Sequence, residues 1–464
     1  MSPTGEVLRF DLPPEAAVGN LTGPSTGIHR LVARPPRDST ATVIDTADHR
    51  LLDWGVELSR VTETGQWVLR APGWAPPLQA ETISPEAEDE LPAEMAGLLV
   101  PFRRGGILGP KLKVSTLRRR FTLSGPDGAV VGELSDERVS VSSHAGQVTT
   151  YRNVTLRLLA AGDDQRAAIT AAFIAAGGVT VEEFPLLADR LGLAHHSGRR
   201  SALSARAVID EFVAAQFESR WSALLRADLS ARTGSGDDGE LRAGLLTLRG
   251  ELAGLEPLLD SDWVRSAEQL VDAALVDRTR PVQRTERWLR ILDLLAVGSA
   301  APPLPYVSGR ITGPVLAQEL EAVVQTLVDQ CRTLEPYSDD ARWTRADQVA
   351  GRAVALSTLA RDVFGKPAKQ LRKNLEPIAD ALAGTVRPAG AALDRDLRGL
   401  STAEVFEAGR AYERAMMSVD YARENLVREW PRLWDRVRNR IIRPRVPHGG
   451  PSAPDAGLES DPPA

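Results

Sequence analysis

The sequence predicts an α+β protein, with a β-rich N-terminal part followed by an all-α C-terminal part. Up to about residue 159, short runs rich in Val, Thr and aromatic residues alternate with Gly, Pro and Asp, which is typical of strands and tight turns. Beyond about residue 202, apolar residues instead recur at spacings of three and four, the period of amphipathic helices. The 464 residues are enough for two or three globular domains.

Strands account for most of the N-terminal part. The strand pattern is clearest over residues 66–70, 117–123, 129–134, 138–142 and 149–159. Pro126-Asp127-Gly128 lies between two of these stretches and predicts a hairpin, because proline presets φ and glycine accepts positive φ. A helix over 163–176 and a shorter helical turn within 184–191 are expected to follow.

Helices are expected throughout the C-terminal part. The helical period runs over residues 203–229, 239–259, 262–275, 285–297, 314–334, 344–363, 366–382, 389–400 and 401–442. These stretches predict a helical bundle over 202–444, joined to the β-rich part, residues 1–194, by a linker over 195–201 that lacks hydrophobic periodicity. Residues 445–464 are rich in Pro, Gly, Ser and Asp, and we expect them to be a disordered tail.

Charge and composition exclude several classes of protein. The net charge of −6 argues against general nucleic-acid binding. The single cysteine, Cys331, excludes an intramolecular disulfide and a cysteine-based zinc cluster. No signal peptide is visible in the first ten residues, and the longest run of low charge, 167–181, is shorter than the ~20 apolar residues that span a membrane. We therefore expect a cytoplasmic protein with neither a nucleic-acid nor a membrane partner.

Basic residues gather in one stretch despite the negative net charge. Between residues 95 and 126 there is no acidic residue, whereas the basic residues are Arg103, Arg104, Lys111, Lys113, Arg118, Arg119 and Arg120. Residues 81–94 carry six acidic residues in total: Glu81, Glu86, Glu88, Asp89, Glu90 and Glu94. The basic stretch is therefore either an anion-binding wall or an exposed strand end that pairs with these carboxylates.

The run from residue 42 to 73 resembles the CYTH triphosphate-tunnel family. The matching residues are Asp45, Thr46, Leu51, Leu52, Gly55, Leu58, Gly65, Trp67 and Leu69, with Arg70 in place of a family lysine. The resemblance implies an antiparallel β-barrel over 1–194. In that family, Lys and Arg side chains inside a closed tunnel hold a triphosphate, and Glu side chains at alternate strand positions hold Mg²⁺ or Mn²⁺.

The resemblance keeps the cations but not the carboxylates. The tunnel cations that it implies are Arg9, Arg70, Arg118, Arg120 and Arg152, preceded at alternate spacing by Lys111 and Lys113. On the first strand the carboxylate positions hold Gly5 and Val7, and Glu6 is one residue out of phase. On the last strand they hold Asn153, Thr155 and Arg157, while Glu133 and Asp136 stand on the strand before. We therefore predict neither a catalytic residue nor a metal site.

The helical part resembles the CHAD family, whose bundles bind polyphosphate through Lys and Arg. The similar stretches are residues 363–373, 378–382, 406–410 and 430–434. The polyanion-binding residues that we predict here are Arg345, Arg352, Lys366, Lys369, Arg372 and Lys373. None of the chain's six histidines stands at a position where that family carries one. A CYTH domain followed by a CHAD domain is an arrangement familiar from bacteria.

These observations favour a degenerate CYTH–CHAD protein that binds inorganic polyphosphate or a phosphorylated small molecule without efficient hydrolysis, and that needs no cofactor. One alternative is a metal-dependent triphosphatase acting on inorganic, thiamine or nucleotide triphosphate, which would require Mg²⁺ or Mn²⁺. Another is a protein-interaction scaffold with no phosphate ligand. Responses to polyphosphate, triphosphate and a metal ion would separate the three hypotheses.

Overall fold

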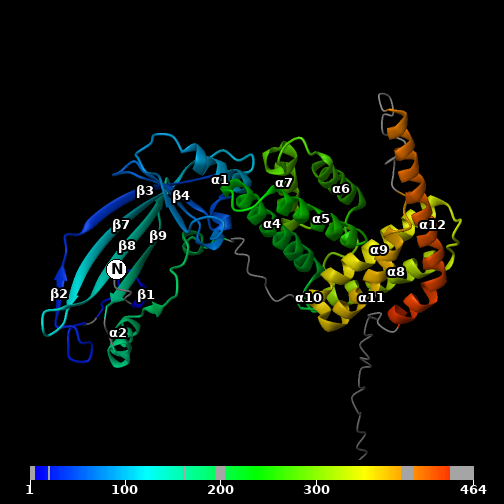
Figure 1. Cartoon of the computed structure of the whole chain (residues 1–464). Helices are drawn as coiled ribbons and strands as arrows, with labels where there is room; N and C mark the ends of the chain where they lie inside the picture. The colour runs from blue at the N-terminus through cyan, green and yellow to red at the C-terminus, as the bar shows by residue number, and fades with distance from the viewer. Residues whose placement is uncertain (1–5, 19–20, 160–161, 194–203, 388–400, 439–464) are drawn as a thin grey trace, which may run out of the picture. The chain divides into compact units, whose positions relative to one another are not determined.

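The computed structural model describes the chain except for residues 1–5, 19–20, 160–161, 194–203, 388–400 and 439–464 (Figure 1). The predicted linker over 195–201, the predicted helix over 389–400 and the predicted tail over 445–464 lie outside the described residues. The α+β class is confirmed. Contacts divide the chain into two compact units: one combines residues 1–199, 218–245 and 273–296, and the other combines 200–217, 246–272 and 297–464. The domain ranges 1–194 and 202–444 stay predictions.

The described residues form one ten-stranded antiparallel sheet. Its strands are β1 Glu6–Leu12, β2 Arg30–Ala33, β3 Arg37–Asp45, β4 Glu57–Val61, β5 Trp67–Arg70, β6 Glu81–Ile83, β7 Gly109–Ser124, β8 Val130–Ser143, β9 Gly146–Leu158 and β10 Val179–Thr180. The order is β10-β1-β9-β8-β7-β3-β4-β5-β6, and β2 pairs with β7. The sheet is antiparallel, as expected. Its strand order does not close on itself, so a barrel is not established.

The central strands β7, β8 and β9 are longer than the sequence indicated. The predicted hairpin at residues 126–128 joins β7 to β8, and Gly128 has the positive φ, 79°, that this turn requires. The stretches 129–134 and 138–142, which the pattern separated, belong to the one strand β8, because Ser135 and Asp136 pair on both sides with β7 and β9.

Two apolar clusters cover parts of the two sides of this sheet. On one side Phe10, Leu134 and Leu156 pack against helix α2, Asp163–Ala175, and the Phe10 and Phe173 rings stack with centroids 4.2 Å apart. On the other side, a smaller cluster packs against the short helix α3, Leu187–Arg190. Beyond this cluster, the second side of the sheet carries polar and charged residues, among them Arg9, Arg70, Arg118 and Arg120. We call this second side the charged face.

The residues that carry the CYTH resemblance hold the backbone in place. The buried carboxylate of Asp45 accepts hydrogen bonds from the backbone N–H groups of Thr46, Leu51 and Leu52 at 2.6, 2.9 and 3.1 Å. Gly55 and Gly65 have φ values of 65° and 68°, which favour glycine. The remaining apolar members are buried: Leu51, Leu52, Leu58, Trp67 and Leu69.

The C-terminal helices lie where the period predicted them. They are α4 Ile209–Thr233, α5 Asp238–Leu255, α6 Ser261–Val276, α7 Glu286–Ala300, α8 Thr312–Arg332, α9 Asp340–Leu359, α10 Arg361–Phe364, α11 Lys366–Ala383 and α12 Thr402–Arg438. Helix α9 packs against α8 and α11, and α11 packs against α12. A further helix, α1 Ala93–Arg103, precedes β7. Within the described ranges, we find no helix with the length and apolarity needed to cross a membrane.

Candidate functional site

Strand register brings three of the predicted cations onto the charged face. Arg118 and Arg120 of β7 lie opposite Glu137 and Ser135 of β8. Ser135 in turn lies opposite Thr155 of β9, which pairs with Arg9 of β1. Because residues directly opposite each other point to the same side of a sheet, the side chains of Arg9, Arg118 and Arg120 share this face.

Two adjoining cavities open on the charged face around Arg118 and Arg120. The larger, about 360 Å³, is also lined by Glu133, Glu137 and Thr155. The smaller, about 160 Å³, contains Pro35 in its lining and shares three arginines with the larger cavity. The arginines around the two cavities, which we call the arginine cluster, are Arg34, Arg37, Arg118, Arg120 and Arg157.

Two members of the arginine cluster are paired with carboxylates. The Nε of Arg118 lies 2.6 Å from a carboxylate oxygen of Glu137, and an Nη of Arg34 lies 3.0 Å from Glu133. The other members, Arg37, Arg120 and Arg157, are exposed, and no carboxylate of the described residues forms an ion pair with them. The cluster therefore carries more positive than negative charge and keeps guanidinium groups accessible to an anion.

Arg70 belongs to a second charged network on the same face. Its Nε lies 2.6 Å from Glu81, and an Nη lies 3.9 Å from Glu57. Burial raises the pKa of Glu57, Arg70 opposes this shift, and Glu81 adds to it. Burial also raises the pKa of Tyr151 to about 12, with a contribution from Glu57.

Three carboxylates act on the pKa of Arg70 in this second network. Burial lowers the pKa of Arg70, but Glu57, Glu81 and Glu137 together raise it above its ordinary value. Arg70 lies on β5 and Glu137 on β8, and three other strands separate them in the sheet order. The contribution from Glu137 is smaller than those from Glu57 and Glu81, whose strands neighbour that of Arg70.

Arg152 and Lys113 do not lie on the charged face. Arg152 is 8% exposed and donates to both carboxylate oxygens of Asp136, at 2.7 and 2.8 Å, and to the carbonyl of Ala16 at 2.6 Å. Lys113 occupies an odd-numbered position of β7, whereas Arg118 and Arg120 occupy even-numbered ones, so Lys113 points to the opposite side. Lys111 lies between Pro110 and Leu112, where the register with β3 shifts, so parity does not place it on either side. The predicted cationic wall is therefore divided between two faces.

The charged face also carries carboxylates, and each of them is paired with an arginine. Asp11 lies 2.8 Å from Arg190 of α3. The paired carboxylates of this face are Asp11, Glu57, Glu81, Glu133 and Glu137. Sequence reasoning noted Glu133 but missed Glu57 and Glu137, whose positions opposite Arg70 and Arg118 depend on strand register. In the part of the chain that the structure describes, no three His, Cys, Asp or Glu side chains are arranged to hold a metal ion.

The predicted cations of the helical part also fall into two groups. Arg352 forms an ion pair with Glu256, and Arg372 lies 2.9 Å from Glu376 one turn along α11. The remaining four are exposed and form no ion pair with a described carboxylate: Arg345, Lys366, Lys369 and Lys373. The three lysines lie at i, i+3 and i+7 on α11 and share one face of that helix.

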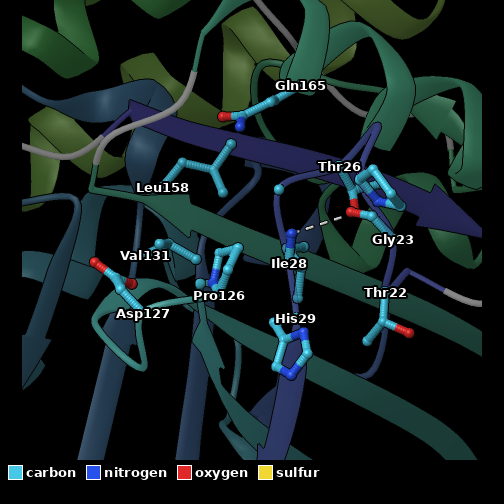
Figure 2. A pocket seen from close by; sticks show the side chains of 13 residues that line it. Thr22, Gly23, Thr26, Ile28, His29, Pro126, Asp127, Val131, Leu158 and Gln165 are labelled. Carbon is cyan, nitrogen blue, oxygen red and sulfur yellow. Dashed lines mark hydrogen bonds between the residues drawn. The ribbon is translucent and has the colours of Figure 1, made fainter.

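A pocket of about 860 Å³ lies at the β7–β8 turn, away from the arginine cluster (Figure 2). Its walls come from the loop around Thr26 and His29, the turn at Pro126 and Gln165 of α2. Figure 2 shows the Thr26 hydroxyl accepting from the backbone N–H of Ile28, at 3.4 Å. The carboxylate of Asp127, which also lines the pocket, already accepts the backbone N–H of Ala129 at 3.0 Å. This pocket brings together no group of cations.

No family model matches this chain, and no curated protein matches its sequence. The resemblances to the CYTH and CHAD families therefore rest on the short motifs named above. Asp45 of the CYTH-like motif accepts hydrogen bonds from the backbone of the turn that follows it. The resemblance therefore supports a shared backbone conformation at this turn more directly than a shared activity.

Proposed function

We propose that the protein binds inorganic polyphosphate or another phosphorylated polyanion on the charged face, without efficient hydrolysis. The arginine cluster is the observation that carries the proposal, since three of its members, Arg37, Arg120 and Arg157, are exposed and form no ion pair with a described carboxylate. Guanidinium groups present a rigid fork that matches phosphate oxygens, and such charge-assisted bonds are about twice as strong as neutral ones.

The chain is, in this proposal, a degenerate CYTH–CHAD protein of the cytoplasm, and its sheet curls into a tunnel around the charged face. A curved wall surrounds a phosphate chain with cations on several sides.

The pairing of the carboxylates supports binding in preference to hydrolysis. A divalent ion would have to compete with Arg118 for Glu137 and with Arg34 for Glu133. On this face, arginines thus neutralise the groups that a catalytic Mg²⁺ would use. In the helical part, Arg345, Lys366, Lys369 and Lys373 would offer a second surface to long phosphate chains.

Calorimetric titration of the full chain with tripolyphosphate at several salt concentrations tests the proposal. We expect the affinity to fall steeply with salt, and Arg120→Ala to weaken binding and to reduce the slope of log K against log[salt] by about one. The matched control is Lys113→Ala, on the same strand but the opposite face, which should leave binding unchanged. An affinity that is independent of salt, or an equal loss in both variants, would refute the proposal, and no binding at all would leave the scaffold hypothesis.

A metal-dependent triphosphatase is the second candidate, and the network around Arg70 favours it. Glu57 and Glu81 lie on neighbouring sides of one guanidinium, and Mg²⁺ commonly takes one or two carboxylates together with substrate phosphates. This candidate predicts phosphate release that requires Mg²⁺ or Mn²⁺ and is abolished in Glu57→Gln. The binding proposal predicts that tripolyphosphate remains intact under the same conditions.

A further inference from the structure

The N-terminal half of α12 extends away from the other helices of its unit. Figure 1 shows this half, in orange, projecting beyond α8, α9 and α11. None of residues 402–418 is buried, and the exposed side chains include Phe406 at 63% and Met417 at 66%. The C-terminal half packs normally, and Leu426 and Trp430 are 4% and 8% exposed. The helix therefore has one packed half and one half that contacts little else.

A single apolar stripe runs through both halves of α12. In the packed half, the buried positions between residues 419 and 430 are Val419, Arg423, Leu426 and Trp430, and Val437 is buried one heptad further on. Their alternating spacing of four and three continues toward the N-terminus through Met416, Tyr412, Gly409 and Val405. This is the a/d pattern of a coiled coil. The exposed half therefore continues a stripe that is an established helix–helix interface further along the same helix.

The sequence specifies a helix in this half even though none of its residues is buried among the described parts of the chain. The Ser401 hydroxyl accepts the backbone N–H of Glu404 at 3.3 Å, and a carboxylate oxygen of Glu404 accepts the backbone N–H of Ser401 at 2.7 Å, which is a capping box. The Arg410 guanidinium lies 5.9 Å from the centre of the Phe406 ring. This half is continuous with the packed half of the 37-residue helix α12, which supports it, and a partner on its apolar stripe would stabilise it further.

We propose that this partner is the same half of α12 in a second copy of the chain, packed antiparallel about a two-fold axis between residues 410 and 411. In antiparallel coiled coils, a positions face d positions. One axis then places Val405 against Met416 of the second copy and Gly409 against Tyr412 of the second copy. The stripe is thus complementary to itself, as a two-fold symmetric interface requires.

Gly409 is the residue that this pairing explains. Glycine within a helix costs about 1 kcal/mol relative to alanine, and a Cβ added at Gly409 would meet no atom within 4 Å. Packing within the described chain therefore does not require a glycine there. In the antiparallel pair, the missing side chain leaves space for the ring of Tyr412 from the second copy. A large residue facing the smallest one allows the two backbones to approach.

Two cysteine variants of the full chain test the register. In the double variant Val405→Cys with Met416→Cys, we expect oxidation to give a covalent dimer, because each new cysteine faces its counterpart in the second copy. Val405→Cys alone should not cross-link, since two residues 405 would lie about 16 Å apart along the axis at 1.5 Å per residue. The native Cys331 is buried and should not contribute. Efficient cross-linking of Val405→Cys alone would indicate parallel pairing and overturn the proposal.

Sedimentation velocity over a range of concentrations tests the association itself. An interface of about three helical turns is at the small end of specific contacts, so we expect a monomer–dimer equilibrium that depends on concentration. Tyr412→Glu should shift it to monomer. Arg414→Glu changes a charge on the outer side of the same helix and should leave it unchanged. A wild-type protein that remains monomeric at all concentrations would overturn the proposal, and would point instead to the chain's own residues 388–400 as the cover of this stripe.

Discussion

The guanidinium of Arg152 donates two hydrogen bonds to the carboxylate of Asp136, and the two residues are 8% and 7% exposed. They come from the neighbouring strands β9 and β8 on the side of the sheet opposite the charged face. A third bond ties Arg152 to the carbonyl of Ala16. An arginine that resembles a tunnel cation in sequence thus fastens an N-terminal loop to the sheet.

Arg152→Ala should destabilise the protein strongly. The substitution leaves the carboxylate of Asp136 buried without its partner, and breaking a buried pair in this way costs roughly 3–5 kcal/mol. Urea denaturation measures the change. Arg120→Ala is the matched control on the same sheet: Arg120 is exposed, so its removal should change the free energy of unfolding by about 0.5 kcal/mol or less. Equal stability of the two variants would contradict the structural role of Arg152.

Asp45→Ala should unfold the turn that carries the CYTH-like motif. Three backbone N–H groups, those of Thr46, Leu51 and Leu52, lose their acceptor. Each buried donor left unpaired costs roughly 1–3 kcal/mol, so a loss of several kcal/mol is expected in chemical denaturation. Asp45→Asn keeps one acceptor oxygen and should fall between the wild type and Asp45→Ala. If Asp45→Ala instead left stability intact and abolished phosphate binding, Asp45 would belong to the binding site.

The stability of the Glu57→Gln variant relative to the wild type should increase as the pH rises. Burial raises the pKa of Glu57 above its ordinary value of 4.5, so the folded state binds this proton more tightly than the unfolded state does. The stabilising contribution of the protonated carboxyl is complete below pH 4.5 and is lost as the pH rises through the folded pKa. Glutamine does not ionise. Thermal unfolding between pH 4 and pH 8 should therefore show the melting temperature of Glu57→Gln rising relative to that of the wild type, because only the wild type loses this contribution.

Asp48→Asn provides a control whose stability relative to the wild type should change with pH in the opposite direction. Burial acts to raise the pKa of Asp48, but hydrogen bonds from Arg50 and Thr46 outweigh it and lower this pKa below 3.8. Its contribution to stability is therefore present above pH 3.8 and is lost as the pH falls through the folded pKa. Asp48→Asn should lose stability relative to the wild type at neutral pH and approach it in acid. Parallel pH profiles for the two variants would contradict the assigned electrostatics.

Replacing Lys366, Lys369 and Lys373 together by glutamate should weaken binding of long-chain polyphosphate. Each lysine that contacts a phosphate contributes about one unit to the slope of log K against log[salt], so the slope should fall in proportion. Tripolyphosphate binding on the charged face should persist. Arg372→Gln is the control from the same helix, because its guanidinium is already paired with Glu376 and should add little. Unchanged affinity in the triple variant would remove the helical part from the proposal.

Much of the secondary structure could be predicted from the sequence, because its signals are local. The helical period located α4 to α9, α11 and α12, and the Pro126-Asp127-Gly128 turn located the hairpin between β7 and β8. Tertiary pairing joined two predicted strands into β8. The sequence also led us to expect a closed barrel, whereas the structure establishes only an antiparallel sheet. Closure depends on contacts between the first and last strands, and no local pattern encodes these.

The candidate site was only partly predictable. The alternation at Arg118 and Arg120 placed both on one face, and the same parity rule would have placed Lys113 on the other. Nothing near Arg152 in the sequence signals its buried partner. The further members of the arginine cluster, Arg34, Arg37 and Arg157, were missed because they come from separate parts of the chain.

The sequence by itself determined most of the helices, some of the strands, where the main hairpin turns, and how much charge each stretch carries. These properties depend on backbone preferences and on side-chain periods of two or 3.6 residues, which act over a few neighbours. Only the tertiary structure decided that Arg120 stays accessible while Arg118 pairs with Glu137 and Arg152 is buried with Asp136. Strand pairing joins residues far apart in the chain, and register alone fixes which charges meet.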